Sequence, residues 1–130
     1  MNSIIGAWHL VAETATDGTG QPRPTLVGPK PLGFIAFTAA GRMIVAVSDG
    51  RSDPIDGPRG YYSYCGSYTF DGTRLVTRVD GASDPRLQDA PQVRGAHFDG
   101  DRLTLRLLDG FFPDADHVVR TLTWDRIASV

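Results

Sequence analysis

Residues 61–80 read YYSYCGSYTFDGTRLVTRVD, and this stretch decides the fold class of the chain. Two strand-like segments, 61–70 and 74–80, flank an Asp-Gly-Thr turn, and an Asp-Gly pair between two such segments is a strong hairpin signal. Alternation with a period of two places Tyr62, Tyr64 and Tyr68 on one face of the first segment. That face has more apolar area to bury than the opposite one. The stretch therefore predicts an antiparallel hairpin whose buried face carries tyrosines.

The remaining sequence repeats this pattern of short strands and turns. The chain holds 15 glycines and 9 prolines among 130 residues, and no segment has a convincing helical periodicity. We expect eight strands, at residues 5–13, 33–38, 42–48, 61–70, 74–80, 91–98, 102–108 and 117–127. The longer connections cover residues 14–32, 49–60, 81–90 and 109–116, and the second of these has room for one helical turn.

Eight sequential antiparallel strands leave two edges exposed, and closure into a barrel removes both. The interior of an eight-stranded barrel is filled by side chains or shared with one small ligand. We therefore expect an all-β, eight-stranded, antiparallel up-and-down barrel with a ligand cavity, forming one domain over residues 1–130. A two-sheet sandwich is the alternative, but most hairpins here join neighbouring strands.

Charge and cysteine content exclude several classes of function. The net charge is -2, from 13 basic and 15 acidic side chains, and no basic stripe suited to nucleic acid is present. No apolar run approaches the ~20 residues that span a bilayer. Cys65 is the only cysteine, which rules out an intrachain disulfide, and the chain begins without a signal-like segment. We expect a soluble cytoplasmic protein that binds neither nucleic acid nor membrane.

Alternation assigns faces on most of the other strands. Trp8 is expected inside, whereas Glu13 is expected on the solvent face of the first strand. On the sixth strand the period does not decide between two phases. One phase buries His97 beside a glycine, and the other buries Arg94 beside Phe98.

A family resemblance covers nearly the whole chain. Gly6-Ala7-Trp8 resembles the Gly-x-Trp signature of lipocalin-like barrels. Other stretches are similar, in order and spacing, to those of small bacterial and fungal lipocalin-like domain proteins: GPKPLGFI at 28–35, YCGSY at 64–68, QVR at 92–94, GDRLTL at 100–105 and LTWDR at 122–126.

The resemblance implies three structural features. Trp8 would plug one end of the barrel with Arg126 stacked on it, a cation–π contact worth roughly 0.5–2 kcal/mol. Residues 14–32 would form a lid over the other end. Arg94 would point inward and His97 outward. The chain departs from the family pattern at Thr77, where many relatives carry histidine, and at Ala96, where an aromatic residue is common.

Arg94 is the most informative candidate, because a buried guanidinium keeps its charge and needs acceptors. Tyrosine hydroxyls and backbone carbonyls could supply them, or Arg94 could anchor a ligand oxygen. The candidate catalytic residues are Arg94, Tyr64 and Tyr68. The candidate ligand-binding residues are Tyr62, Met43, Val45, Thr77, Ala96, Phe98, Leu105 and His117.

Other chemistry is weakly indicated. His117 follows two aspartates, but three potential ligands in four loop residues are common by chance, so we expect no metal and no cofactor. Phe111 and Phe112 suggest a portal or a homodimer contact.

The leading hypothesis is a small enzyme of secondary metabolism or catabolism with isomerase, cyclase or hydro-lyase chemistry on an apolar, oxygen-bearing molecule. The alternatives are a non-catalytic binding or carrier protein and a barrel with a filled interior and no ligand.

Overall fold

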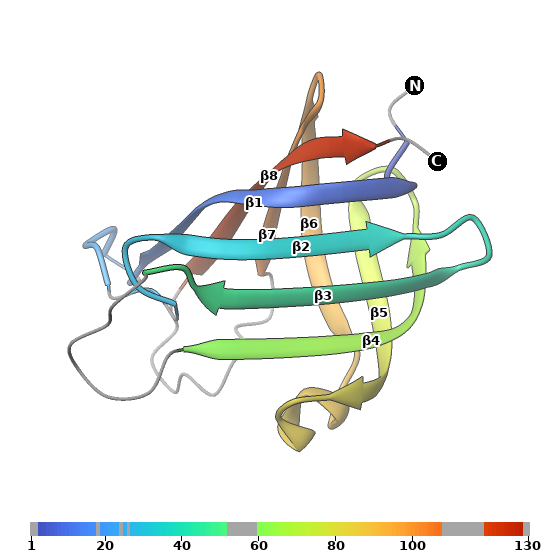
Figure 1. The fold of residues 1–130 in the computed structure, drawn as a ribbon, viewed down its shortest axis with the longest axis horizontal. Helices are drawn as coiled ribbons and strands as arrows, with labels where there is room; N and C mark the ends of the chain where they lie inside the picture. Colours follow the sequence, from blue (N-terminus) through green and yellow to red (C-terminus); the bar gives the residue numbers. More distant parts are fainter. Residues whose placement is uncertain are drawn as a thin grey trace.

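A computed structural model of the chain describes residues 3–17, 19–23, 25, 27–51, 60–107 and 119–128. Within these residues each strand pairs with the next and the last pairs with the first, which closes an antiparallel barrel (Figure 1). The strands are β1 (Gly6–Thr16), β2 (Pro31–Phe37), β3 (Arg42–Asp49), β4 (Tyr61–Phe70), β5 (Arg74–Ala82), β6 (Gln92–Asp99), β7 (Arg102–Leu107) and β8 (Val119–Ala128). The predicted eight-stranded up-and-down barrel is confirmed.

Hairpin turns lie where the glycines predicted them. Gly72, between β4 and β5, has a φ of 105°, and Gly100, between β6 and β7, has a φ of 60°. These left-handed conformations favour glycine, because a Cβ would clash with the backbone there. The turn chemistry therefore sets two of the three tight connections, which join β2 to β3, β4 to β5 and β6 to β7 at one end of the barrel.

Strand ends differ from the prediction where the pairing is long-range. β1 continues to Thr16, because Thr16 pairs with Val119 at the start of β8. An unpredicted 3₁₀ helix, η1 (Pro85–Gln88), lies between β5 and β6. The helical turn considered for residues 49–60 falls mostly outside the described residues, as do Phe111, Phe112 and His117.

A β-bulge in β1 turns Glu13 toward the interior, opposite to the predicted face. The pairing of β1 with β8 shifts register between Leu10 and Ala12, so alternation resumes one residue out of phase. Trp8 and Leu10 face inward before the bulge, and Glu13 faces inward after it. The prediction of a solvent-facing Glu13 was wrong, because it carried one phase through the whole strand.

Another register shift lies between β4 and β5, after Cys65. A Cβ at Gly66 would overlap the backbone carbonyl oxygen of Arg78. The close approach of the two backbones therefore requires glycine at this position.

Trp8 and Arg126 form the predicted plug at the end of the barrel where β1 begins. The guanidinium carbon of Arg126 lies 4.1 Å from the centroid of the Trp8 ring. The indole nitrogen of Trp8 donates to the carbonyl of Ile4 at 3.0 Å. Arg126 donates to the carbonyls of Ile5, at 3.0 Å, and Ser3, at 2.6 Å. Arg126 also forms an ion pair with Asp101 at 3.4 Å. We call this end of the barrel, where Trp8 and Arg126 pack together, the closed end.

The opposite end, which we call the open end, carries the longer connections (Figure 1). Val27, between β1 and β2, and Leu87, in η1, are each only 1% exposed and belong to the main hydrophobic cluster. Gly28 lies against the side chains of Asp49 and Arg51, which form an ion pair at 2.6 Å beside the end of β3. Part of the expected lid therefore packs onto the core.

The described residues contain no helix long and apolar enough to cross a membrane.

Candidate functional site

Arg94 faces the barrel interior from β6 and is 6% exposed. Its guanidinium donates to the carbonyl of Val93 and to the side-chain oxygen of Gln92, both at 3.0 Å. Gln92 in turn donates to the carbonyls of Leu87, at 3.1 Å, and Ala90, at 3.2 Å. Hydrogen bonds to carbonyls of η1 and its flank thus orient Gln92, and Gln92 orients Arg94. This phase of β6 leaves His97 exposed, so the inward Arg94 implied by the resemblance is confirmed.

The partners of Arg94 are neutral. Arg94 forms no salt bridge with the residues that the structure describes. Removing a guanidinium from water costs free energy, and two neutral acceptors compensate that cost only partly. The guanidinium therefore retains capacity to bind an acceptor of negative or partly negative charge.

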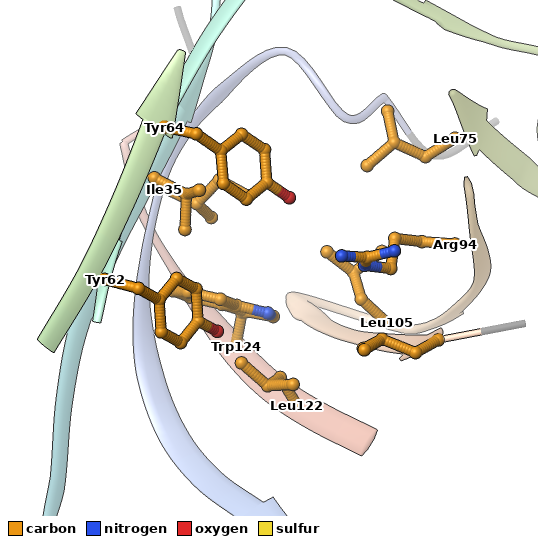
Figure 2. A pocket seen from close by; sticks show the side chains of 10 residues that line it. Ile35, Tyr62, Tyr64, Leu75, Arg94, Leu105, Leu122 and Trp124 are labelled. Atoms are coloured by element: carbon orange, nitrogen blue, oxygen red, sulfur yellow. The ribbon is translucent and has the colours of Figure 1, made fainter. Parts of the chain in front are cut away.

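Tyr62 and Tyr64 face Arg94 across the interior. Both are buried and project from β4, and Figure 2 shows their hydroxyl groups pointing into the space in front of the guanidinium. Burial raises the pKa of the Tyr62 phenol, and the nearby Tyr64 and Glu13 raise it further, while Arg94 and Arg120 act in the opposite direction. Tyr62 therefore keeps its proton at neutral pH and remains a hydrogen-bond donor.

Trp124 supplies another donor to the same space. It projects from β8, is 1% exposed, and its indole nitrogen has no hydrogen-bond partner among the described residues. Figure 2 shows the indole edge pointing toward the middle of the cavity. Buried donors without partners are rare, and each one calls for an explanation.

These groups line one small cavity. Its volume is about 20 Å³, which is enough for about one water molecule. The residues that line it are Ile35, Val45, Tyr62, Tyr64, Leu75, Arg94, Leu105, Leu107, Leu122 and Trp124 (Figure 2). A ligand with more than a few atoms must displace side chains to enter, so the cavity accommodates a polar group more readily than a complete ligand.

A buried ion pair that the sequence did not reveal lies near this cavity. Arg120, on β8, and Glu13, on β1, are both buried, with a nitrogen–oxygen distance of 3.6 Å. Both charges act on Tyr62, which places them within electrostatic range of the tyrosine pair. Only the bulge in β1 turns Glu13 inward, and a bulge leaves no reliable signal in a single sequence. Arg120 could have been found by alternation with Leu122 and Trp124.

The structure brings together some of the predicted site residues. Arg94, Tyr62, Tyr64, Val45 and Leu105 line the cavity. Four more are buried or half-buried in the interior but do not line it: Met43, Thr77, Ala96 and Phe98. His117 lies outside the described residues.

Tyr68 and Phe98 lie toward the closed end instead. The Tyr68 hydroxyl donates to the carbonyl of Thr38 at 2.7 Å, and its ring packs edge-on against Phe37 at 5.1 Å. The ring centroids of Phe98 and Trp8 lie 6.1 Å apart. Tyr68 shares the alternation of Tyr62 and Tyr64, but two further steps along β4 carry it away from Arg94.

Among the described residues, no group of three or more histidine, cysteine, aspartate or glutamate side chains is arranged to hold a metal ion. Cys65 lies outside the barrel interior, with its sulfur 3.7 Å from Asp80.

Comparison with known proteins gives one result. The family model described as "Lipocalin-like domain" matches residues 51–127, from the β3–β4 connection to β8. No curated protein and no solved structure matches the chain significantly. The match covers more than half of the 130 residues, and it includes Tyr62, Tyr64, Arg94 and Trp124. The chain therefore belongs to the lipocalin-like domain family.

Proposed function

We propose that the barrel binds a small, mostly apolar molecule through an oxygen atom placed at Arg94. The observation that carries this proposal is the buried guanidinium with only neutral protein partners, facing a cavity whose other walls are largely apolar. An arginine in such a site binds an oxygen acceptor strongly, because the interaction is not screened by water.

The size of the cavity affects how binding occurs. About 20 Å³ accommodates the oxygen group alone, so the apolar part of the ligand must displace side chains. Val27 and Leu87 cover the core at the open end and belong to connections rather than strands. Displacement at that end disrupts fewer backbone hydrogen bonds than displacement within the barrel wall, so we assign ligand entry to the open end.

An enzyme with isomerase, cyclase or hydro-lyase chemistry is the second candidate. Two tyrosine hydroxyls face the same space as Arg94, and Tyr62 holds its proton firmly. Arg94 would polarise a carbonyl oxygen, and Tyr64 would donate a proton to that oxygen as negative charge develops on it. The closed barrel would exclude water from the reacting group.

Native mass spectrometry of the purified protein tests the binding function, supported by thermal-shift titration with apolar acids, ketones and alcohols. We expect a bound ligand that the Arg94→Met variant loses. Arg106→Met is the matched control, because Arg106 lies on the neighbouring strand β7 with an exposed side chain. Retention of the ligand by Arg94→Met at the wild-type level, or a wild-type protein that binds nothing, would reject the proposal.

Incubation with that ligand tests the enzyme. Conversion by the wild type that falls about 100-fold or more in Tyr64→Phe, with binding retained, supports proton donation by Tyr64. If the ligand is unchanged after prolonged incubation, the enzyme is rejected and only the binding function stands.

A further inference from the structure

The unsatisfied indole of Trp124 restricts the chemistry of the ligand. Its nitrogen carries a hydrogen that can be donated and no lone pair that can accept. Among the described residues nothing accepts this hydrogen, although the side chain is only 1% exposed. The other tryptophan, Trp8, donates to the carbonyl of Ile4 at 3.0 Å. The difference points to an acceptor that the ligand supplies at Trp124.

Arg94, on β6, also requires hydrogen-bond acceptors. A guanidinium also has donors only, and two of its nitrogens are engaged by Val93 and Gln92. Trp124 and Arg94 line the same cavity, which holds about one oxygen-sized group, with a volume of about 20 Å³. Tyr62 and Tyr64, whose hydroxyls can also donate, line the same cavity. The cavity is therefore rich in donors.

The pairing of the buried charges indicates that the acceptor is an anion. The buried carboxylates among the described residues are Glu13 and Asp49, and each lies beside another arginine, Arg120 at 3.6 Å and Arg51 at 2.6 Å. Arg94 forms no salt bridge with the described residues. A ligand with one negative charge supplies the anionic partner that this buried guanidinium lacks.

We infer that the barrel selects a monoanionic ligand whose charged oxygen, from a carboxylate or an enolate, lies between the indole nitrogen of Trp124 and the guanidinium of Arg94. This inference rests on the proposed function, and it adds the charge of the ligand and the role of Trp124. Trp124 is then a specificity-determining residue, because its N–H donates more strongly to a negatively charged oxygen than to the oxygen of a neutral alcohol or ketone.

Matched probes test the charge. Hexanoate carries the carboxylate, and the enolate of 5,5-dimethylcyclohexane-1,3-dione carries the alternative oxyanion. The neutral and cationic counterparts are 1-hexanol, 3,3-dimethylcyclohexanone and hexylamine. We expect at least one anion to bind the wild-type protein about tenfold or more tightly than its neutral counterpart, because a hydrogen bond to a charged group is stronger than one to a neutral group. Which of the two anions binds more tightly identifies the source of the oxyanion.

The two indole groups provide an internal control. A ¹H–¹⁵N spectrum of the full chain contains two indole signals, from Trp8 and Trp124, which the variants Trp8→Phe and Trp124→Phe assign. Saturation with the anion should move the Trp124 signal downfield, as its hydrogen gains an acceptor, and leave the Trp8 signal in place. The wild-type spectrum keeps the test valid even if one variant folds poorly.

The outcomes separate the two proposals. If an alcohol or ketone binds as tightly as the anion, or the Trp124 signal does not move at saturation, the inference of an oxyanion ligand is wrong while the binding function stands. If Trp124→Phe keeps its fold and binds the anion as the wild type does, Trp124 has no role in selection. If no probe binds at any concentration and no ligand is retained on purification, both proposals fail.

Discussion

The barrel has one tryptophan stacked with an arginine at the closed end, and another tryptophan and arginine that line the interior cavity. The two regions differ in how fully the donors of these side chains are used. At the closed end, Trp8 donates to Ile4 and Arg126 stacks on the ring while donating to two carbonyls. In the interior, Trp124 has no acceptor among the described residues and Arg94 has neutral partners only. At the closed end the donors of the tryptophan and the arginine have acceptors within the protein, and the two residues form a structural plug. In the interior the tryptophan lacks an acceptor among the described residues, and the two residues line a candidate binding site.

Replacing Trp8 should have the largest effect on stability. Trp8 is fully buried, and Trp8→Ala removes its contacts with Phe98 and Arg126. We expect a loss of about 3–5 kcal/mol in the free energy of unfolding, as for other large aromatic truncations. Urea denaturation measures it. A loss below about 1 kcal/mol would mean that the closed end is not a plug.

Arg126→Met should cost about 1–3 kcal/mol, because it removes the cation–π contact, two hydrogen bonds from a charged group and the exposed ion pair with Asp101. The matched control is Arg102→Met on the neighbouring strand, whose ion pair with Asp125 is half-exposed. Surface ion pairs contribute about 0–1 kcal/mol. Equal losses in the two variants would show that stacking on Trp8 contributes nothing beyond surface electrostatics.

Tyr62 should make stability depend on alkaline pH. Burial raises the pKa of Tyr62 in the folded state, whereas an unfolded tyrosine ionises near pH 10. Its contribution is fully present below about pH 10 and is lost as pH rises toward the folded pKa, at up to about 1.4 kcal/mol per pH unit. Tyr62→Phe should flatten this decline between about pH 10 and 11, and Tyr61→Phe, an exposed neighbour, should not. Identical pH profiles for Tyr62→Phe and the wild type would contradict the prediction.

Arg94→Met should change stability least, by about 1 kcal/mol or less in either direction. It removes two hydrogen bonds, but it also removes a buried charge that lacks an anionic partner. Thermal and urea unfolding of the ligand-free protein measure the change. A loss above about 3 kcal/mol would make Arg94 a structural residue like Arg126 and would remove the contrast between the closed end and the interior cavity.

Much of the fold could be predicted because its signals are local. The Asp-Gly turns at residues 71–72 and 99–100 and the alternation of Tyr62 and Tyr64 depend only on neighbours along the chain. The site was harder to predict. Tyr62 and Tyr64 were found by face, and Arg94 was found by the family resemblance after alternation had left its strand undecided. Tyr68 shares the face of the two tyrosines but lies near Thr38 instead, because alternation gives the direction of a side chain and not its depth in the barrel.

The sequence by itself determined the strand count, the hairpin order and the inward faces of β3 and β4, since these follow from turn residues and a period of two. Only the tertiary structure decided the rest. The pairing of β1 with β8 introduced the bulge that buries Glu13, and closure of the barrel placed Trp124 and Arg94 around one cavity. These features join residues far apart in the chain, so which donors remain unsatisfied depends on the packing of strands and not on local pattern.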